Sequence, residues 1–205
     1  MAISFDTNHK PVIGKAEQLE DDLVVITADN ASPMTFTGTR TYILGTKNLI
    51  IIDPGPDSDA HLSSIMEYIG KRKVTDILLT HSHIDHSPLS RQLKIETGAR
   101  IIGFGSADEA RTSFMKKLSS SLDLGGEEGI DKDLALDKKV IDKQILNLNN
   151  YSIEVVHTPG HLSNHVCFSL KERQILFSGD HVMGWATTLI SPPDGDLGSF
   201  MNSLE

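Results

Sequence analysis

Three histidines and one aspartate fall within six residues of this sequence, at His81, His83, Asp85 and His86. They follow the apolar run 77–79, which is typical of a buried strand. Side chains two residues apart point to the same side of an extended backbone, so we expect His81 and His83 to face the same space. Asp85 and His86 can reach that space from another direction once the chain turns. Imidazole and carboxylate groups suit zinc, manganese and iron and need no cysteine. The spacing predicts a metal site; the alternative is a polar loop with solvated histidines.

The elements that must position this cluster are indicated by apolar patterning. Two apolar runs, 41–44 and 49–52, are joined by a glycine-containing segment, which predicts a hairpin. Apolar residues spaced i, i+3, i+4, i+7 predict a helix over 58–69, and on this pattern His61 lies off the apolar face, in solvent. The strand 49–52 ends at Asp53, followed by proline and glycine, so Asp53 is placed at a turn that stops regular structure.

A second helix is expected directly after the histidine cluster. Ser87 and Pro88 predict an N-cap followed by a proline in the first turn, for a helix that ends near Thr97. The apolar run 100–104 then predicts another strand. The resulting alternation of strand and helix is typical of βαβ units.

The second half of the chain is rich in short apolar runs separated by turns. Residues 106–120 predict a weakly amphipathic helix, and 124–129 an acidic loop that is either solvated or covers the mouth of a site. Short strands are predicted at 139–141, 152–156, 166–170 and 174–177. Patterning alone therefore predicts a mixed α and β protein.

The pattern His-x-His-x-Asp-His after a strand resembles the signature of the metallo-β-lactamase superfamily. Two more motifs of that family follow, Thr158-Pro159-Gly160-His161 and Ser178-Gly179-Asp180. The resemblance implies the family's α+β fold, an αββα four-layer sandwich. It also implies a metal-dependent hydrolase that uses one or two zinc ions, with manganese or iron as alternatives.

The resemblance further assigns a ligand to each of these positions. One ion would be held by His81, His83 and His161. A second would be held by Asp85 and His86, with Asp180 between the two ions. Asp85 is the implied catalytic residue, which orients an attacking hydroxide or carries its proton. The reaction class is metal-assisted hydrolysis.

Two further residues have two interpretations each. In the family, an aspartate at the position of Asp53 lies beneath the metal site and orients the ligands, but a turn-capping role is the alternative. His165 lies where several branches have a histidine that contacts substrate or supports the ligands, and a histidine at a strand edge on the surface is equally compatible with the sequence. His181 and Trp185 follow Asp180 and are candidates to line a pocket, and a place in the core is an equal alternative for Trp185.

The segment 179–204 resembles the β-lactamase-like protein two group, whose mitochondrial members are endoribonucleases specific for single strands. The implied substrate is a phosphodiester or a (thio)ester, in a small molecule or in single-stranded RNA. Three other interpretations stay open: a thioesterase like glyoxalase II, a mononuclear iron oxidoreductase, and an incomplete module without catalysis.

Composition limits the remaining classes. The chain has 205 residues, enough for one domain, and a formal net charge of −9, which disfavours broad non-specific binding of nucleic acid. The single cysteine, Cys167, fits a reducing compartment, and the first residues lack the apolar stretch of a signal peptide. We expect a cytoplasmic protein that does not associate with membranes.

No histidine follows His181, although the family has a final histidine ligand near its C-terminus. We therefore expect residues 1–205 to form a single domain that lacks the family's C-terminal end. The second metal site would then have only Asp85, His86 and Asp180. The sequence predicts no oligomeric state.

Overall fold

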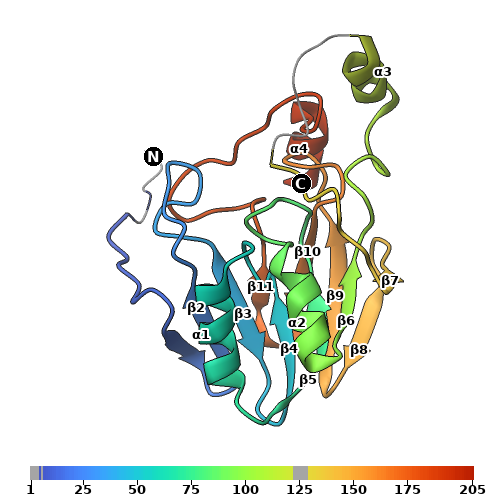
Figure 1. The fold of residues 1–205 in the computed structure, drawn as a ribbon. Helices are drawn as coiled ribbons and strands as arrows, with labels where there is room; N and C mark the ends of the chain where they lie inside the picture. Colours follow the sequence, from blue (N-terminus) through green and yellow to red (C-terminus); the bar gives the residue numbers. More distant parts are fainter. Residues whose placement is uncertain (1–4, 6, 122–128) are drawn as a thin grey trace.

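The computed structural model describes residue 5 and residues 7–121 and 129–205 (Figure 1). The acidic loop expected at 124–129 lies outside these residues except for Gly129. Two β-sheets pack against each other, and their loops gather at one end of the molecule, at the top of Figure 1. Of the described helices, none has the length and apolar character needed to cross a membrane.

The larger sheet has seven strands that follow one another in chain order. Its first four strands are antiparallel neighbours, and the last four pair in parallel. The strands are β1 (Ala16–Glu20), β2 (Leu23–Thr27), β3 (Arg40–Leu44), β4 (Asn48–Ile52), β5 (Lys73–Leu78), β6 (Arg100–Gly103) and β7 (Lys138–Lys139).

The smaller sheet has four antiparallel strands. In spatial order they are β11 (Ile175–Phe177), β10 (Val166–Leu170), β9 (Tyr151–His157) and β8 (Ile145–Leu148). The turn between β10 and β11 is a single 3₁₀ turn, η1 (Lys171–Arg173).

Helices α1 (Asp59–Ile69) and α2 (Leu89–Thr97) cover the outer face of the seven-stranded sheet (Figure 1). Helices α3 (Ser113–Ser121) and α4 (Leu197–Ser203) lie at the loop end of the sheets. The expected α+β class is confirmed by this arrangement of two sheets and four helices among the described residues.

The central strands are apolar on both faces, which explains why their sequences are continuous apolar runs rather than alternating ones. In β4, Leu49 and Ile51 pack beneath the helices, whereas Ile50 and Ile52 face the four-stranded sheet. Burial on both sides holds the carboxyl end of β4 in place, so that Asp53 projects from a rigid support.

The predicted position of His61 in solvent is wrong. The side chain is only 3% exposed, and its Nε2 lies 2.8 Å from the Thr41 hydroxyl of β3. His61 precedes Ile65 and Ile69 by four and eight residues, so it extends the same buried stripe of α1. The ring supports the turn after β4, because a Cβ added at Gly55 would lie 3.0 Å from His61 Cδ2.

The predicted start of α2 also needs correction. The helix begins at Leu89, and Pro88 occupies the N-cap position without a side-chain cap. The Ser87 hydroxyl instead donates to Asp131 Oδ2 at 2.9 Å and to the His83 carbonyl at 3.2 Å. It thereby holds the histidine loop to the segment after residue 128.

The helix expected over 106–120 is shorter than predicted, because α3 begins only at Ser113.

Candidate functional site

The predicted site residues come together at the loop end of the two sheets, where the strands carrying them end. Asp53 follows β4, the histidine loop follows β5, His161 follows β9 and Asp180 follows β11. Carboxyl ends of neighbouring strands meet at one edge of a sheet, and this edge is the usual place for a site in such folds. Residues far apart in the sequence are therefore gathered by the topology.

Three imidazoles face one another in the first group. His81 Nε2 and His161 Nε2 each lie 3.0 Å from His83 Nδ1, and Asp180 Oδ2 lies 3.5 Å from His161 Nε2. The four ligand atoms all lie within 4.8 Å of one another. We call these four residues the imidazole cluster.

The protonation states in the imidazole cluster fit a cation. Burial, reinforced by the neighbouring rings, holds the pKa of His81 well below its usual value and lowers that of His83 to about 4. The His161 Nδ1 lies 2.7 Å from the Leu189 carbonyl, which can only accept, so Nδ1–H donates to it and Nε2 is the nitrogen that faces the cluster. Rings that stay neutral can direct lone pairs at a cation held between these nitrogens. This donor set is the one that zinc and similar ions prefer.

The second group is richer in carboxylates. His86 Nε2 lies 3.3 Å from both Asp85 Oδ2 and Asp180 Oδ1. Burial alone would lower the pKa of His86, but the carboxylates of Asp85 and Asp180 outweigh it and raise the pKa well above its usual value. Burial would likewise raise the pKa of Asp85, but His86 lowers it to about 2. We call these three residues the carboxylate cluster; Asp180 belongs to both clusters, with one oxygen toward each.

Asp53 supports both clusters from below. Its Oδ1 accepts the Thr80 backbone N–H at 2.8 Å, and its Oδ2 accepts the Thr80 hydroxyl at 2.6 Å and His86 Nδ1–H at 3.0 Å. The Thr80 oxygen in turn lies 2.9 Å from His81 Nδ1, so that it accepts from the ring. One buried carboxylate thus fixes the ring orientation of a histidine in each cluster. Sequence reasoning missed Thr80, whose only signal was a hydroxyl immediately before the first histidine.

His165 is completely buried, which excludes a position on the surface. Its Nδ1 lies 2.8 Å from the Thr158 hydroxyl, and its Nε2 accepts the Asp180 backbone N–H at 3.2 Å. The ring therefore lies behind the Asp180 turn and holds it in place. Gly179 permits this contact, since it has φ 49° and a Cβ there would lie 2.7 Å from His165 Nε2. The neighbouring His181 turns away, with its Nε2 3.2 Å from the carbonyl of Ser203 in α4.

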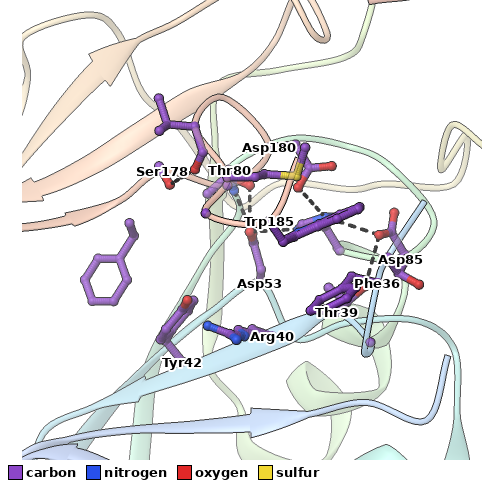
Figure 2. A pocket seen from close by; sticks show the side chains of 18 of the residues that line it. Phe36, Thr39, Arg40, Tyr42, Asp53, Thr80, Asp85, Ser178, Asp180 and Trp185 are labelled. Atoms are coloured by element: carbon purple, nitrogen blue, oxygen red, sulfur yellow. Dashed lines mark hydrogen bonds and ion pairs between the residues drawn. The ribbon is translucent and has the colours of Figure 1, made fainter. Parts of the chain in front are cut away.

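A pocket of about 330 Å³ opens beside the carboxylate cluster (Figure 2). Asp85, His86 and Asp180 line one part of it, and the Thr39 hydroxyl donates to Asp85 Oδ2 at 3.0 Å. The rings of Phe36 and Trp185, which also line the pocket, stack at 5.2 Å with an angle of 12° between their planes. Trp185 was a predicted lining residue, whereas the loop around Phe36 was not, because nothing in its composition distinguishes it from an ordinary turn.

A model of the metallo-β-lactamase superfamily matches residues 34–205. The lactamase-like protein aptB of Emericella nidulans is 28% identical to this chain over 207 residues, which cover 98% of this chain and 57% of that protein. An atrochrysone carboxyl ACP thioesterase of Aspergillus terreus is 30% identical over 205 residues, which cover 98% of this chain and 55% of that protein. The chain thus spans a little over half the length of these curated relatives.

Among solved structures, a β-lactamase domain protein from Burkholderia ambifaria superimposes with a TM-score of 0.72 over 98% of this chain and 69% of that chain, at 17% sequence identity. At this sequence identity the match supports a shared fold only. The sequence model covers most of the chain and includes all the residues gathered at the site. The chain belongs to the metallo-β-lactamase superfamily.

Proposed function

We propose that this chain is a metal-dependent hydrolase that cleaves thioesters. The observation that carries the proposal is the position of Asp180, whose Oδ2 approaches the imidazole cluster while its Oδ1 approaches His86. A carboxylate shared between an all-nitrogen group and an oxygen-rich group is suited to a pair of metal ions. Relatives named as thioesterases support the choice of substrate.

The residues that would hold metal are those of the two clusters. The imidazole cluster would hold one ion, and the carboxylate cluster a second. Zinc suits this mixture of imidazole and carboxylate, with manganese and iron as the alternatives. When bound, such ions lower the pKa of water and polarise the carbonyl that is attacked.

The protein side chains supply the proton handling. Asp85 stays ionised at neutral pH, because the facing His86 lowers its pKa to about 2 against the opposite effect of burial. Its carboxylate, held by the Thr39 hydroxyl, accepts the proton that an attacking water loses. The water oxygen bonds to the thioester carbon, the C–S bond breaks, and the proton passes from Asp85 to the leaving thiolate.

The pocket favours a small acyl group over a nucleic acid. Its walls include apolar and aromatic side chains, Phe36, Trp185 and Met183 among them, and Arg40 is the one arginine or lysine among the described residues that line it. The single-stranded RNA implied by the resemblance to endoribonucleases finds no support in the relatives reported above. That branch assignment stays a prediction.

A comparison of three substrates tests the proposal. Release of free thiol from an acyl-pantetheine thioester is measured beside cleavage of a cephalosporin and of single-stranded RNA, for the wild type and Asp85→Ala. We expect turnover of the thioester that falls by orders of magnitude in Asp85→Ala and is unchanged in Asp21→Ala, an exposed control.

Turnover of the cephalosporin or of RNA alone would contradict the thioesterase assignment. Uptake of oxygen that depends on iron would favour an oxidoreductase instead. No turnover of any substrate by metal-loaded protein would favour a non-catalytic module.

A further inference from the structure

Strand β3 sends alternate side chains to opposite sides of the seven-stranded sheet. Ile43 packs in the core beneath the helices, and Thr41 hydrogen-bonds to the histidine of α1. Arg40 and Tyr42 therefore point to the other side, toward the four-stranded sheet, and both line the pocket beside the carboxylate cluster (Figure 2). The Tyr42 ring packs edge-on against Phe177 of β11, with ring centroids 5.3 Å apart.

Both polar groups lack a partner within the described chain. Neither the Arg40 guanidinium nor the Tyr42 hydroxyl forms a hydrogen bond or an ion pair with any residue that the structure describes, and Figure 2 draws none between them and the other pocket residues. Two donors, two residues apart on one rigid strand, are thus available to a ligand in the pocket. A guanidinium presents a planar fork that matches a carboxylate or a phosphate.

Arg40 is an exception among the arginines of this chain. Four others form ion pairs with carboxylates: Arg91 with Asp131, Arg100 with Asp76, Arg111 with Asp194, and Arg173 with Asp22. The remaining one, Arg72, stacks on the Tyr68 ring at 4.4 Å.

The acidic character of the pocket makes this free cation informative. Asp53, Asp85 and Asp180 all line the same cavity, yet Arg40 pairs with none of them. Arg40 and Tyr42 stand together on β3, apart from the loops that carry the carboxylate cluster (Figure 2). An anion that entered the pocket would be repelled by the carboxylates and attracted by Arg40, so its position would be restricted to the β3 side.

We propose that Arg40 and Tyr42 bind an anionic oxygen group of the substrate and so determine which thioester the pocket accepts. The inference rests on the proposed thioesterase function and adds a substrate class to it, an acyl thioester that carries a second, negatively charged group. The anion has two possible sources, a carboxylate on the acyl group or the phosphate of a phosphopantetheine arm. Arg40 would form the bidentate contact, and the Tyr42 hydroxyl would donate a further hydrogen bond.

Trp185 provides a signal of pocket occupancy that needs no turnover. It is the single tryptophan of the sequence, and it lines the pocket stacked on Phe36. Its fluorescence is titrated with three thioethers, which lack the carbonyl and are not hydrolysed: S-carboxybutyl pantetheine, its methyl ester, and the same methyl ester on phosphopantetheine. The first carries only the carboxylate, the second neither charge and the third only the phosphate.

Four proteins are compared: the wild type, Arg40→Gln, Tyr42→Phe and Lys47→Gln. Lys47 is exposed in the turn after β3, so its variant makes the same change in net charge away from the pocket. We expect one charged probe to bind wild type about tenfold or more tightly than the uncharged ester. Arg40→Gln should remove this preference, Tyr42→Phe should reduce it, and Lys47→Gln should retain it. The charged probe that is preferred identifies the source of the anion.

Equal affinity of wild type for all three probes would overturn the inference, as would a preference that Arg40→Gln retains. Thiol release from the matching thioesters is measured separately. If the thioesters are hydrolysed but Arg40→Gln does not change the preference among them, the thioesterase proposal stands and the proposed anion site is refuted. If Arg40→Gln removes the binding preference among the probes but no thioester is hydrolysed, the anion site is supported and the thioesterase proposal is refuted.

Discussion

Seven histidines of this chain, six of them buried and His83 half-buried, form two groups that look alike in sequence but differ in where their ring nitrogens point. His81, His83, His86 and His161 direct a nitrogen toward another ring or a carboxylate of the two clusters. His61, His165 and His181 are also buried, yet their ring nitrogens contact a threonine hydroxyl, a backbone N–H or a backbone carbonyl. Burial alone therefore does not distinguish the two groups of histidines; the direction of their ring nitrogens does.

The two groups also differ in what supports them. The histidines whose nitrogens point into the two clusters depend on partners behind them, such as Asp53 beneath His86 and the Leu189 carbonyl behind His161. The other group, which we call the supporting histidines (His61, His165 and His181), hold neighbouring segments in place, as His165 holds the Asp180 turn. Substitutions in the first group should therefore abolish chemistry, and substitutions in the second should shift stability or affinity.

The largest effect is expected at Asp180, which both clusters share. Asp180→Ala should lower kcat for thioester hydrolysis by about a thousandfold or more, because it removes the carboxylate that has one oxygen toward each cluster. Circular dichroism should show that the fold survives. The exposed Asp21→Ala variant is the control, and turnover in Asp180→Ala within a few fold of that control would rule out a bridging role.

A supporting histidine should reveal itself through the pH dependence of stability. Burial lowers the pKa of His61 from 6.5 to about 4. The folded protein therefore keeps the neutral ring, so its contribution is complete above pH 6.5 and is lost as the pH falls from 6.5 to 4, while the unfolded chain takes up the proton. The total loss is about 3 kcal/mol of unfolding free energy.

Urea unfolding of the wild type and His61→Gln at a series of pH values measures this difference. The variant should be less stable at pH 8, and the gap should close toward pH 4, because only the wild type loses the contribution of His61. A gap that stays constant with pH would show that His61 does not titrate as its burial implies.

A smaller effect is expected from the hydroxyl between Asp53 and His81. Thr80→Val removes the acceptor for His81 Nδ1–H and one donor to Asp53, so zinc affinity should fall by about tenfold to a hundredfold. Competition with a chromophoric chelator measures the affinity. Thr80→Ser keeps the hydroxyl and should restore most of it; a serine variant as weak as the valine variant would point to lost packing instead.

Much of the site was predictable because its residues follow strand ends that burial makes easy to recognise. The histidine loop follows a strand that is apolar on both faces, and the predicted motif residues do meet in space. His61 was assigned to solvent because only apolar residues were counted, although its spacing to Ile65 and Ile69 placed it on the buried stripe. A helical pattern identifies a face, and a polar residue can share that face when it finds a partner.

Other features had no local signal. Strand β1 is exposed at every position and forms through pairing with β2, so its sequence shows no apolar pattern. Asp53 and Thr80 meet through the pairing of β4 with β5, which the spacing of residues in the chain does not encode. The single-domain assignment and the cytoplasmic location stay predictions.

The central claim, that ring direction separates metal ligands from their supports, is tested most directly by calorimetric titration of chelator-treated protein with zinc. We expect wild type to bind one ion tightly at the imidazole cluster and any second ion more weakly at the carboxylate cluster, which has a single imidazole. His161→Ala should lose the tight site, and His165→Gln should retain it. Absence of zinc uptake, or equal loss in both variants, would contradict the account.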